Sequence, residues 1–131
     1  MDLVTVFFAY ILFFLFVHWV ADFVLQTEQM ANNKSTSNYW LGMHVGVYTL
    51  TTILSWFILF LIVGLYATLL QYVLAALSIF VMHFITDYIT SRITGRYYKN
   101  KKYRQFFTTI GFDQWLHYLQ IFAVFNYIIL S

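Results

Sequence analysis

The sequence predicts an all-α protein, a bundle of four transmembrane helices arranged as two helical hairpins. The first reason is composition: 62% of the 131 residues are hydrophobic and 9% are charged, whereas soluble domains carry about 25% charged residues. The second reason is that the apolar residues form four stretches, each long enough to cross a bilayer core about 30 Å thick. The third is that six of the seven basic residues lie within residues 92–104, as expected of one cytoplasmic loop.

The first transmembrane helix is expected at residues 3–26, in a chain that forms one integral membrane domain over residues 1–131. A cleaved signal peptide is the alternative interpretation of such an apolar N-terminal stretch. Asp2 stands where a signal peptide has basic residues, and His18 and Asp22 stand where it has small residues before the cleavage site. These polar positions favour a retained helix.

The middle of the chain predicts two more helices. Residues 27–38 are polar and predict a loop, and the second and third helices are expected at residues 40–63 and 67–90. A single helix over both segments would be about 76 Å long, more than twice the thickness of the bilayer core. The chain must therefore turn near Gly64.

A basic loop is expected at residues 91–106, and the fourth helix at residues 112–130, which are just long enough to cross a bilayer. The positive-inside rule places this loop in the cytoplasm, so both termini are expected outside. Its lysine and arginine side chains are expected to set the topology and to face lipid head groups. We therefore expect membrane lipids as partners and no nucleic acid, and the sequence leaves a homo-oligomer open.

Three histidine–aspartate pairs stand in these apolar segments, with the two members of each pair four positions apart. At that spacing, two side chains on a helix share one face and lie about one turn apart. The last pair has the reverse order, which fits a helix that crosses the membrane in the opposite direction. The pairs are His18 with Asp22, His83 with Asp87, and Asp113 with His117.

Together with His44, these side chains form a set of seven at one depth, in the cytoplasmic half of the expected bundle. An aspartate inside a bilayer costs roughly 2.5–3.5 kcal/mol on insertion scales, so such groups indicate function. One interpretation is hydrogen bonding or a proton relay, and the other is coordination of a metal ion. Because a relay does not require paired residues on three helices, we favour the metal.

A weak internal repeat supports the arrangement in two hairpins. Residues 18–23 match residues 83–88, and residues 40–44 align with residues 113–117. Two hairpins that run in the same direction predict parallel repeats about an axis along the membrane normal.

The chain has no cysteine, so the expected ligands are imidazole nitrogens and carboxylate oxygens. This mixture favours Zn²⁺, with Mn²⁺ and Fe²⁺ as alternatives. The seven candidate ligands exceed the four of one zinc ion, so one or two ions are expected.

Gln26, Gln114 and Arg92 lie at the same level and are candidates to support the ligands or to contact a substrate. No catalytic side chain is assigned, and the expected nucleophile is a water molecule whose pKa the metal lowers.

The combined motifs are more specific than any one pair. They are His18-x-x-x-Asp22-Phe-x-Leu-Gln26-Thr, then Met30-Ala31-x-Asn33-Lys34, His44, His83-x-x-x-Asp87, and Asp113-Gln114-x-x-His117. Over nearly the whole chain they resemble the domain of unknown function 3307, a family of small integral membrane proteins of bacteria and their phages. The resemblance implies a multi-pass protein of the bacterial inner membrane and implies no activity. More loosely, the pattern is similar to membrane-bound metal-dependent hydrolases, some of which are grouped with zinc phospholipase C and P1 nuclease, by analogy alone.

The function expected from these features is metal-dependent hydrolysis of a phosphoester or related bond in a lipid or another amphiphile, at the cytoplasmic leaflet. The alternatives are a metal ion or proton transporter, a structural metal-binding adaptor in the membrane, and an oxidoreductase with a metal–carboxylate site. A transporter needs access from both sides, whereas the outer halves of the expected helices are almost wholly apolar. That one-sided distribution favours an enzyme or a static site.

Overall fold

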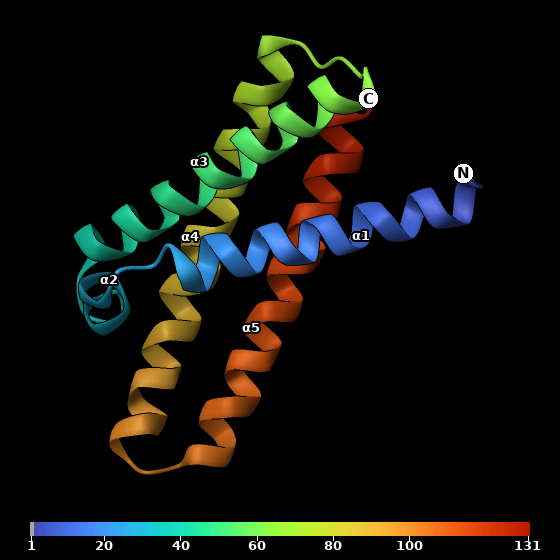
Figure 1. Cartoon of the computed structure of the whole chain (residues 1–131). Coiled ribbons are helices and arrows are strands. Elements are labelled where there is room, and N and C mark those ends of the chain that lie inside the picture. The colour runs from blue at the N-terminus through green and yellow to red at the C-terminus, as the bar shows by residue number, and fades with distance from the viewer. Residues whose placement is uncertain (1) are drawn as a thin grey trace.

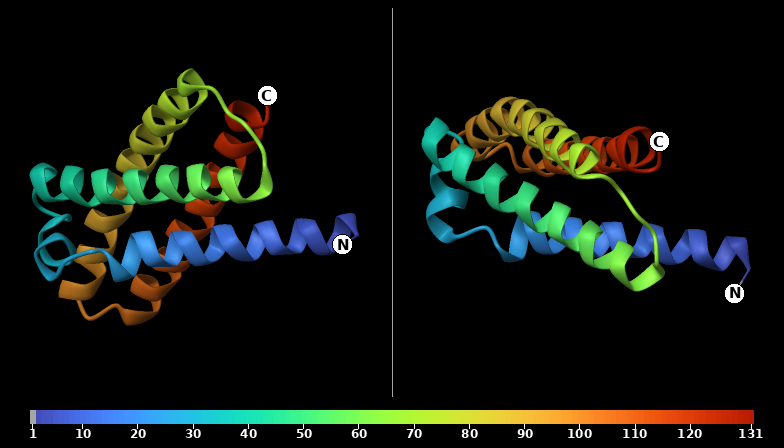
Figure 2. Two further views of the ribbon diagram at one scale, coloured as in Figure 1. Left: turned by 45° about the horizontal axis from the view of Figure 1, so that its top comes forward. Right: turned by 90° about the horizontal axis from the view of Figure 1, so that it is seen from above.

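The computed structural model describes residues 2–131, and within them the chain is all-helical, with no strand. The long helices form two antiparallel pairs, α1 with α3 and α4 with α5, and the pairs cross each other (Figure 1 and Figure 2). A short helix, α2, and two π-helical turns, η1 and η2, complete the fold. The elements are α1 (Leu3–Trp19), η1 (Val20–Val24), α2 (Glu28–Asn33), α3 (Asn38–Val63), α4 (Leu69–Lys99), α5 (Tyr103–Val124) and η2 (Phe125–Ile129).

The first helix does not remain α-helical as far as residue 26. After Trp19 the chain makes the π-helical turn η1, in which the N–H of Leu25 donates to the carbonyl oxygen of Val20 at 2.9 Å. A π-helical turn accommodates one extra residue, and such turns are frequent at functional sites. This one carries Asp22, so the turn decides where that carboxylate points.

Residues 27–38, expected as a loop, contain the short helix α2. The hydroxyl oxygen of Thr27 accepts a hydrogen bond from the N–H of Met30 at 3.2 Å, which caps the helix. Met30 is only 5% exposed, so its side chain anchors α2 to the bundle. The polar composition of this segment does not reveal that anchor, and the expectation of a loop is therefore wrong for residues 28–33.

The connection between α3 and α4 is defined by a local sequence signal at each end. Gly64 has a φ of 71° and ends α3 in the left-handed region, where a residue without a Cβ atom is not strained. Thr68 and Gln71 begin α4 with a capping box, because each side chain accepts a hydrogen bond from the backbone N–H of the other.

The helix α4 extends to Lys99, so the expected basic loop over residues 91–106 is reduced to residues 100–102. Lys101, with a φ of 57°, takes the left-handed position that closes the end of α4. The basic residues marked the position of the turn. They did not mark its length, because no proline interrupts the helix after residue 90.

Within residues 2–131, three helices are long and apolar enough to cross a membrane, over Thr5–Val24, Asn38–Val63 and Leu69–Lys99. Large apolar side chains remain on the outer surface, and Ile62 and Leu69 are 77% and 80% exposed. Soluble proteins rarely expose so much contiguous apolar surface, so the chain is a membrane protein. The helix α5 is not among the three, since its first half is rich in polar residues.

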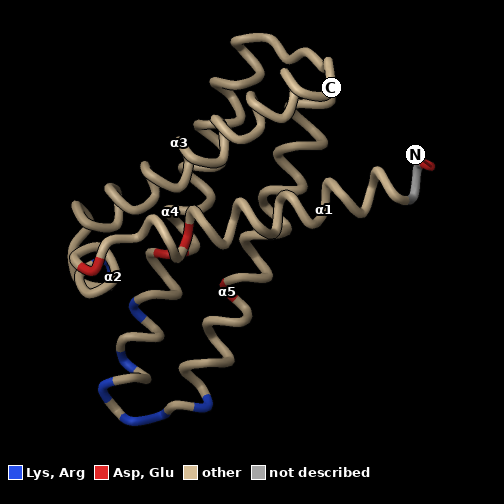
Figure 3. The backbone as a smooth tube through the Cα atoms, viewed as in Figure 1, with Lys and Arg blue, Asp and Glu red and all other residues tan. Residues whose placement is uncertain are grey.

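Aromatic side chains fill the part of the bundle that lies away from the basic α4–α5 turn. Phe14, Trp56, Phe60 and Phe125 are all buried there, and the rings of Phe14 and Phe125 lie with their centroids 4.6 Å apart. Acidic residues in the middle of the fold lie on the side of α2 and the basic turn (Figure 3), and the buried histidines lie within 4 Å of Asp22 or Asp87. The fold thus divides into a part with a buried aromatic core and a polar part.

Candidate metal centre

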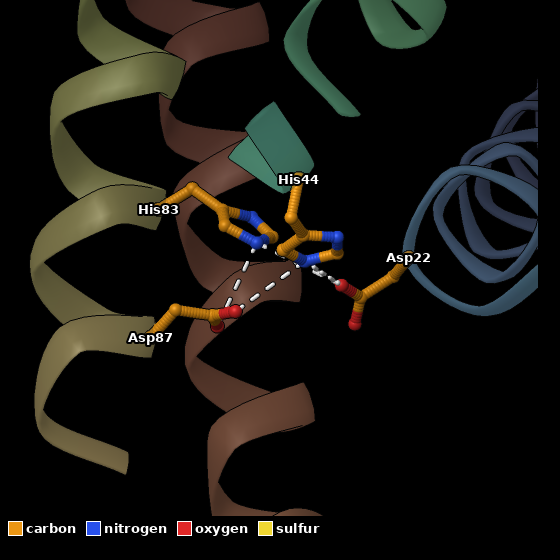
Figure 4. A group of neighbouring side chains, drawn as sticks. All are labelled: Asp22, His44, His83 and Asp87. Atoms are coloured by element: carbon orange, nitrogen blue, oxygen red, sulfur yellow. Dashed lines mark ion pairs between the residues drawn. The ribbon is translucent and has the colours of Figure 1, made fainter. Parts of the chain in front are cut away.

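The polar part holds a cluster of histidine and aspartate side chains that come from η1, α3 and α4 and point toward one another (Figure 4). Each of the four drawn side chains, Asp22, His44, His83 and Asp87, is at most 4% exposed. Two overlapping groups extend the cluster to α1 and α5. Ligand atoms within 4.8 Å of one another are offered by Asp22, His44, His83 and Asp87, by His18, Asp22 and His117, and by Asp87, Asp113 and His117.

The distances in the first group match those between the ligands of a small metal ion. The Nε2 atom of His44 lies 3.0 Å from Oδ1 of Asp22 and 3.3 Å from Oδ2 of Asp87. The Nε2 atom of His83 lies 3.7 Å from Asp22 and 3.6 Å from Asp87. Four nitrogen and oxygen ligands about 2.1 Å from a tetrahedral zinc ion are about 3.4 Å from one another. The group is therefore compact enough to surround one ion.

Several polar atoms in this cluster have no hydrogen-bond partner although they are fully buried. They include both ring nitrogens of His83 and of His117. Buried polar groups in proteins are nearly always hydrogen-bonded, and each exception calls for an explanation such as an ion. Hydrogen bonds among the side chains of the cluster therefore leave these four nitrogens without a partner. The donor set of imidazoles and carboxylates fits a metal ion such as Zn²⁺.

His117 is held between two carboxylates. Its Nε2 atom lies 3.4 Å from Oδ1 of Asp87, and its Nδ1 atom lies 3.4 Å from Oδ2 of Asp113. Asp113 is itself fixed by the hydroxyl of Thr90, at 2.5 Å, and by the amide of Gln114, at 3.1 Å. A carboxylate behind a histidine orients the ring of a metal ligand. Asp113 is placed for that role.

His18 differs from the other histidines because both of its ring nitrogens are hydrogen-bonded. Its Nδ1 atom lies 2.8 Å from the hydroxyl of Tyr48, and its Nε2 atom lies 2.7 Å from Oε1 of Gln114. The amide nitrogen of Gln114 also donates to Oδ2 of Asp22 at 2.9 Å. His18 and Gln114 thus form a hydrogen-bonded frame that fixes Asp22, and Gln114 lies where a supporting residue is expected.

Lys34, which the sequence did not mark as a site residue, reaches the cluster from the end of α2. Its ammonium nitrogen lies 2.9 Å from Oδ2 of Asp87 and 3.5 Å from Nε2 of His44. Burial works against the charged form, but the carboxylates of Asp87 and Asp22 raise the pKa of Lys34 above its ordinary value. The carboxylates of the cluster therefore favour the charged form of Lys34 beside them.

The two remaining predicted site residues lie in different surroundings. Gln26 borders the cluster, and its Oε1 atom is buried without a partner. Arg92 lies on another face of α4, where its guanidinium stacks on the ring of Tyr88 at 3.6 Å and donates to the side chain of Asn38 at 2.8 Å. The structure thus brings Gln26 to the site and places Arg92 as a link between α4 and α3.

A cavity of about 500 Å³ gives access to the cluster from one side. Residues of η1, α2, α4 and α5 line it, and the carboxylates of Asp22, Asp87 and Asp113 are among them. Lys34 and Lys99 also line it. In Figure 3, Lys and Arg gather at the α4–α5 turn, the end of the fold on which the cavity lies.

Three further residues of the site escaped the sequence analysis. Tyr48 follows His44 by four positions on α3, and Thr90 follows Asp87 by three on α4, so helical spacing could have placed both on the site faces. Lys34 carried a different signal, as the one basic residue outside the run at residues 92–104.

Comparison with known proteins adds one finding. A family model described as "Protein of unknown function (DUF3307)" matches residues 10–131, and this range contains every residue of the cluster. No curated protein matches the sequence. No solved structure matches it either.

Proposed function

Because this chain belongs to the protein family of unknown function DUF3307, whose description assigns no activity, we propose a function from the site itself: metal-dependent hydrolysis within the membrane. The bond hydrolysed is a phosphoester or a related bond of a lipid or another amphiphile at the cytoplasmic leaflet. The proposed protein is a four-helix transmembrane bundle of the bacterial inner membrane, in which α5 is the fourth span and both termini lie outside.

The observation that carries this proposal is the cavity beside the cluster. A catalytic metal site must keep one position open for water or substrate, whereas a structural site is closed by protein ligands. Here the carboxylates of Asp22 and Asp87 border a cavity of about 500 Å³, which is within the size range of small-molecule sites. This access supports an enzyme over a structural metal adaptor.

The proposed roles of the side chains follow from their contacts. Asp22, His44, His83 and Asp87 hold the ion, which we propose to be Zn²⁺, and the four histidine–aspartate separations of 3.0 to 3.7 Å support this assignment. A bound Zn²⁺ supplies a Lewis acid and lowers the pKa of a water molecule. Further ligand atoms on the α5 side of Asp87 leave room for a second ion.

The other side of the cluster supports hydrolysis over transport. Tyr48 and Trp56 are 1% and 0% exposed, and they separate the histidines from the outer end of the bundle, together with the aromatic core described above. A transporter must open its site to both sides in turn. The cavity opens on the side of the basic turn, which suits a substrate whose head group lies at the cytoplasmic surface.

The deciding experiment measures two activities of the same preparation. Purified protein is reconstituted into liposomes with Zn²⁺, Mn²⁺ or Fe²⁺, and head-group release from a panel of phospholipids is measured beside metal uptake into the vesicles. We expect release without uptake, and we expect Asp87→Ala to abolish it while Arg96→Met, a change in an exposed residue outside the cavity, does not. Uptake without release would establish the transporter, and neither activity would leave the structural adaptor.

A further inference from the structure

The cavity beside the cluster contains polar atoms that the fold leaves without a partner. Ser91 is 9% exposed, yet its hydroxyl has no hydrogen-bond partner. Other hydroxyls in these helices donate to the carbonyl four residues earlier, as Thr51 does to Val47 at 2.8 Å and Thr52 does to Tyr48 at 3.0 Å. Ser91 lines the cavity and is therefore free to donate to a molecule inside it.

Gln26, in the connection between η1 and α2, provides the complementary group. Its Oε1 atom is buried without a partner, and Gln26 also lines the cavity. A buried carbonyl oxygen of this kind needs a donor, and a hydroxyl group of a ligand can supply one. The cavity thus offers a donor at Ser91, an acceptor at Gln26, and the ammonium group of Lys34, which is already 2.9 Å from Asp87.

The charge of the cavity makes anion binding depend on the metal. Three carboxylates and two ammonium groups line it, so its formal charge is −1. One divalent ion bound by Asp22 and Asp87 changes the sign to positive. An anion is then attracted to a cavity in which a lysine and a metal ion face it, an arrangement common in phosphate sites.

Part of the wall of the cavity is apolar, although polar side chains such as Asn32, Ser35 and Thr94 also line it. Phe23 of η1 and Phe106 and Ile110 of α5 form the apolar part, and Phe23 is 47% exposed on the outer surface. An acyl chain can extend from the cavity along these apolar side chains into the surrounding lipid. A free anion has no apolar surface to bury against them.

We propose that this cavity binds the head group of an anionic phospholipid that carries a hydroxyl group, with the phosphate at Lys34 and Ser91 and the hydroxyl at Gln26. The assignment rests on the proposed function, since it names the substrate class of the same site. The acyl chains lie along Phe23 and Ile110. The site binds its lipid only when the metal is present.

The test measures binding rather than hydrolysis. Short-chain phosphatidylglycerol, short-chain phosphatidylcholine and inorganic phosphate are titrated calorimetrically into the full-length protein in uncharged micelles, with and without Zn²⁺. We expect phosphatidylglycerol to bind more tightly than the other two, and only with Zn²⁺. Lys34→Met is expected to weaken this binding about tenfold, the effect of losing one charged hydrogen bond.

Three further variants separate a specific site from general attraction to a basic surface. Ser91→Ala removes a hydroxyl that has no partner in the protein, so it should leave thermal stability and metal content unchanged while it weakens lipid binding several-fold. Arg96→Met removes one positive charge at the same end of the fold but outside the cavity, and should leave binding unchanged. Lys34→Arg keeps the charge and should restore most of the binding lost in Lys34→Met.

Each other outcome has a definite meaning. Equal losses in Arg96→Met and Lys34→Met would show that surface charge attracts the lipid, and would overturn the proposal. Equal binding of inorganic phosphate would also overturn it, since the lipid would then not be what the site recognises. Lipid that is bound but never cleaved would support this binding site and refute the hydrolase. Lipid cleavage that is unaffected by Ser91→Ala and Lys34→Met would support the hydrolase and refute this binding site.

Discussion

The imidazole rings of His83 and His117 lie stacked, with their centroids 4.0 Å apart and their planes inclined by 21°. The two rings come from α4 and α5, and their Nε2 atoms lie 3.6 and 3.4 Å from the same oxygen, Oδ1 of Asp87. Neither nitrogen makes a hydrogen bond. Two unpartnered nitrogens beside one carboxylate oxygen suit ligands that converge on ions better than they suit a proton relay.

The first prediction concerns metal content. Purified protein should contain about one or two divalent transition-metal ions per chain. His83→Ala and Asp87→Ala should each lower the occupancy, and Asp87→Ala should also destabilise the fold by about 1–2 kcal/mol, because it removes the partner of the partly buried charge of Lys34. Elemental mass spectrometry and thermal unfolding in detergent measure the two effects. Full metal content in both variants would remove the basis of the proposed centre.

The second prediction separates His18 from the other histidines. Since both of its nitrogens are hydrogen-bonded, His18→Gln should retain most of the bound metal, whereas His83→Gln should not. Metal titration with a competing chelator compares the two variants directly. A larger loss in His18→Gln than in His83→Gln would show that His18 is a ligand.

The third prediction concerns the residues behind His117. Asp113→Asn weakens the carboxylate that faces Nδ1 of His117 at 3.4 Å, so metal affinity should fall. The expected loss is about 10- to 100-fold, as for other residues that orient a metal-bound histidine. Thr90→Val removes a hydroxyl that holds Asp113 and should act in the same direction but less strongly. An unchanged affinity in Asp113→Asn would mean that His117 is oriented by packing alone.

The fourth prediction concerns topology. A cysteine at Lys102, in the basic turn between α4 and α5, should react with a membrane-impermeant reagent only from the cytoplasmic side. A cysteine added after Ser131 should react only from outside if α5 crosses the membrane. Labelling of intact cells and of inverted vesicles compares the two positions. Reaction of both cysteines from the same side would rule out α5 as a span.

The fifth prediction concerns the turn between α3 and α4. Gly64→Ala should destabilise the protein by about 1 kcal/mol, because alanine is strained at a φ of 71° while no neighbouring atom obstructs its Cβ. Gly46→Ala is the control: it also meets no obstruction, and it lies inside α3, where alanine should stabilise by roughly 0.5–1 kcal/mol. Chemical unfolding in detergent should therefore give effects of opposite sign.

The all-helical fold was predictable because it depends on long apolar stretches, which the bilayer permits only as helices or closed barrels. The ends of the helices were less predictable from the sequence. The end of α4 is fixed by the left-handed conformation of Lys101, a residue with no intrinsic preference for it, and α2 is fixed by the burial of Met30. The burial of Met30 depends on tertiary packing, which the local sequence does not contain. The turn at Lys101 is closed by local backbone bonds, such as that from Lys102 to Tyr97 at 2.9 Å, which any residue type can make.

For the site, helical spacing could show which side chains share a face, but not what each one contacts across the bundle. His18 and His83 have the same relation to an aspartate four positions later, and only the structure shows that Tyr48 and Gln114 occupy both nitrogens of His18. The π-helical turn η1 also limited what the sequence could predict about the site. It changes the direction of the Asp22 side chain, and it has no sequence signature.

The cluster draws its members from both halves of the chain. Asp22 and His44 belong to the N-terminal hairpin, and His83, Asp87 and His117 belong to the C-terminal one, so neither hairpin alone carries a complete centre. In the membrane, helices insert first and associate afterwards. An ion bound at Asp22 and Asp87 would link two hairpins that had been inserted into the membrane separately. Maturation of the protein would then depend on the metal supply of the cell, and a chelator present during synthesis should leave two hairpins that are inserted but loosely associated.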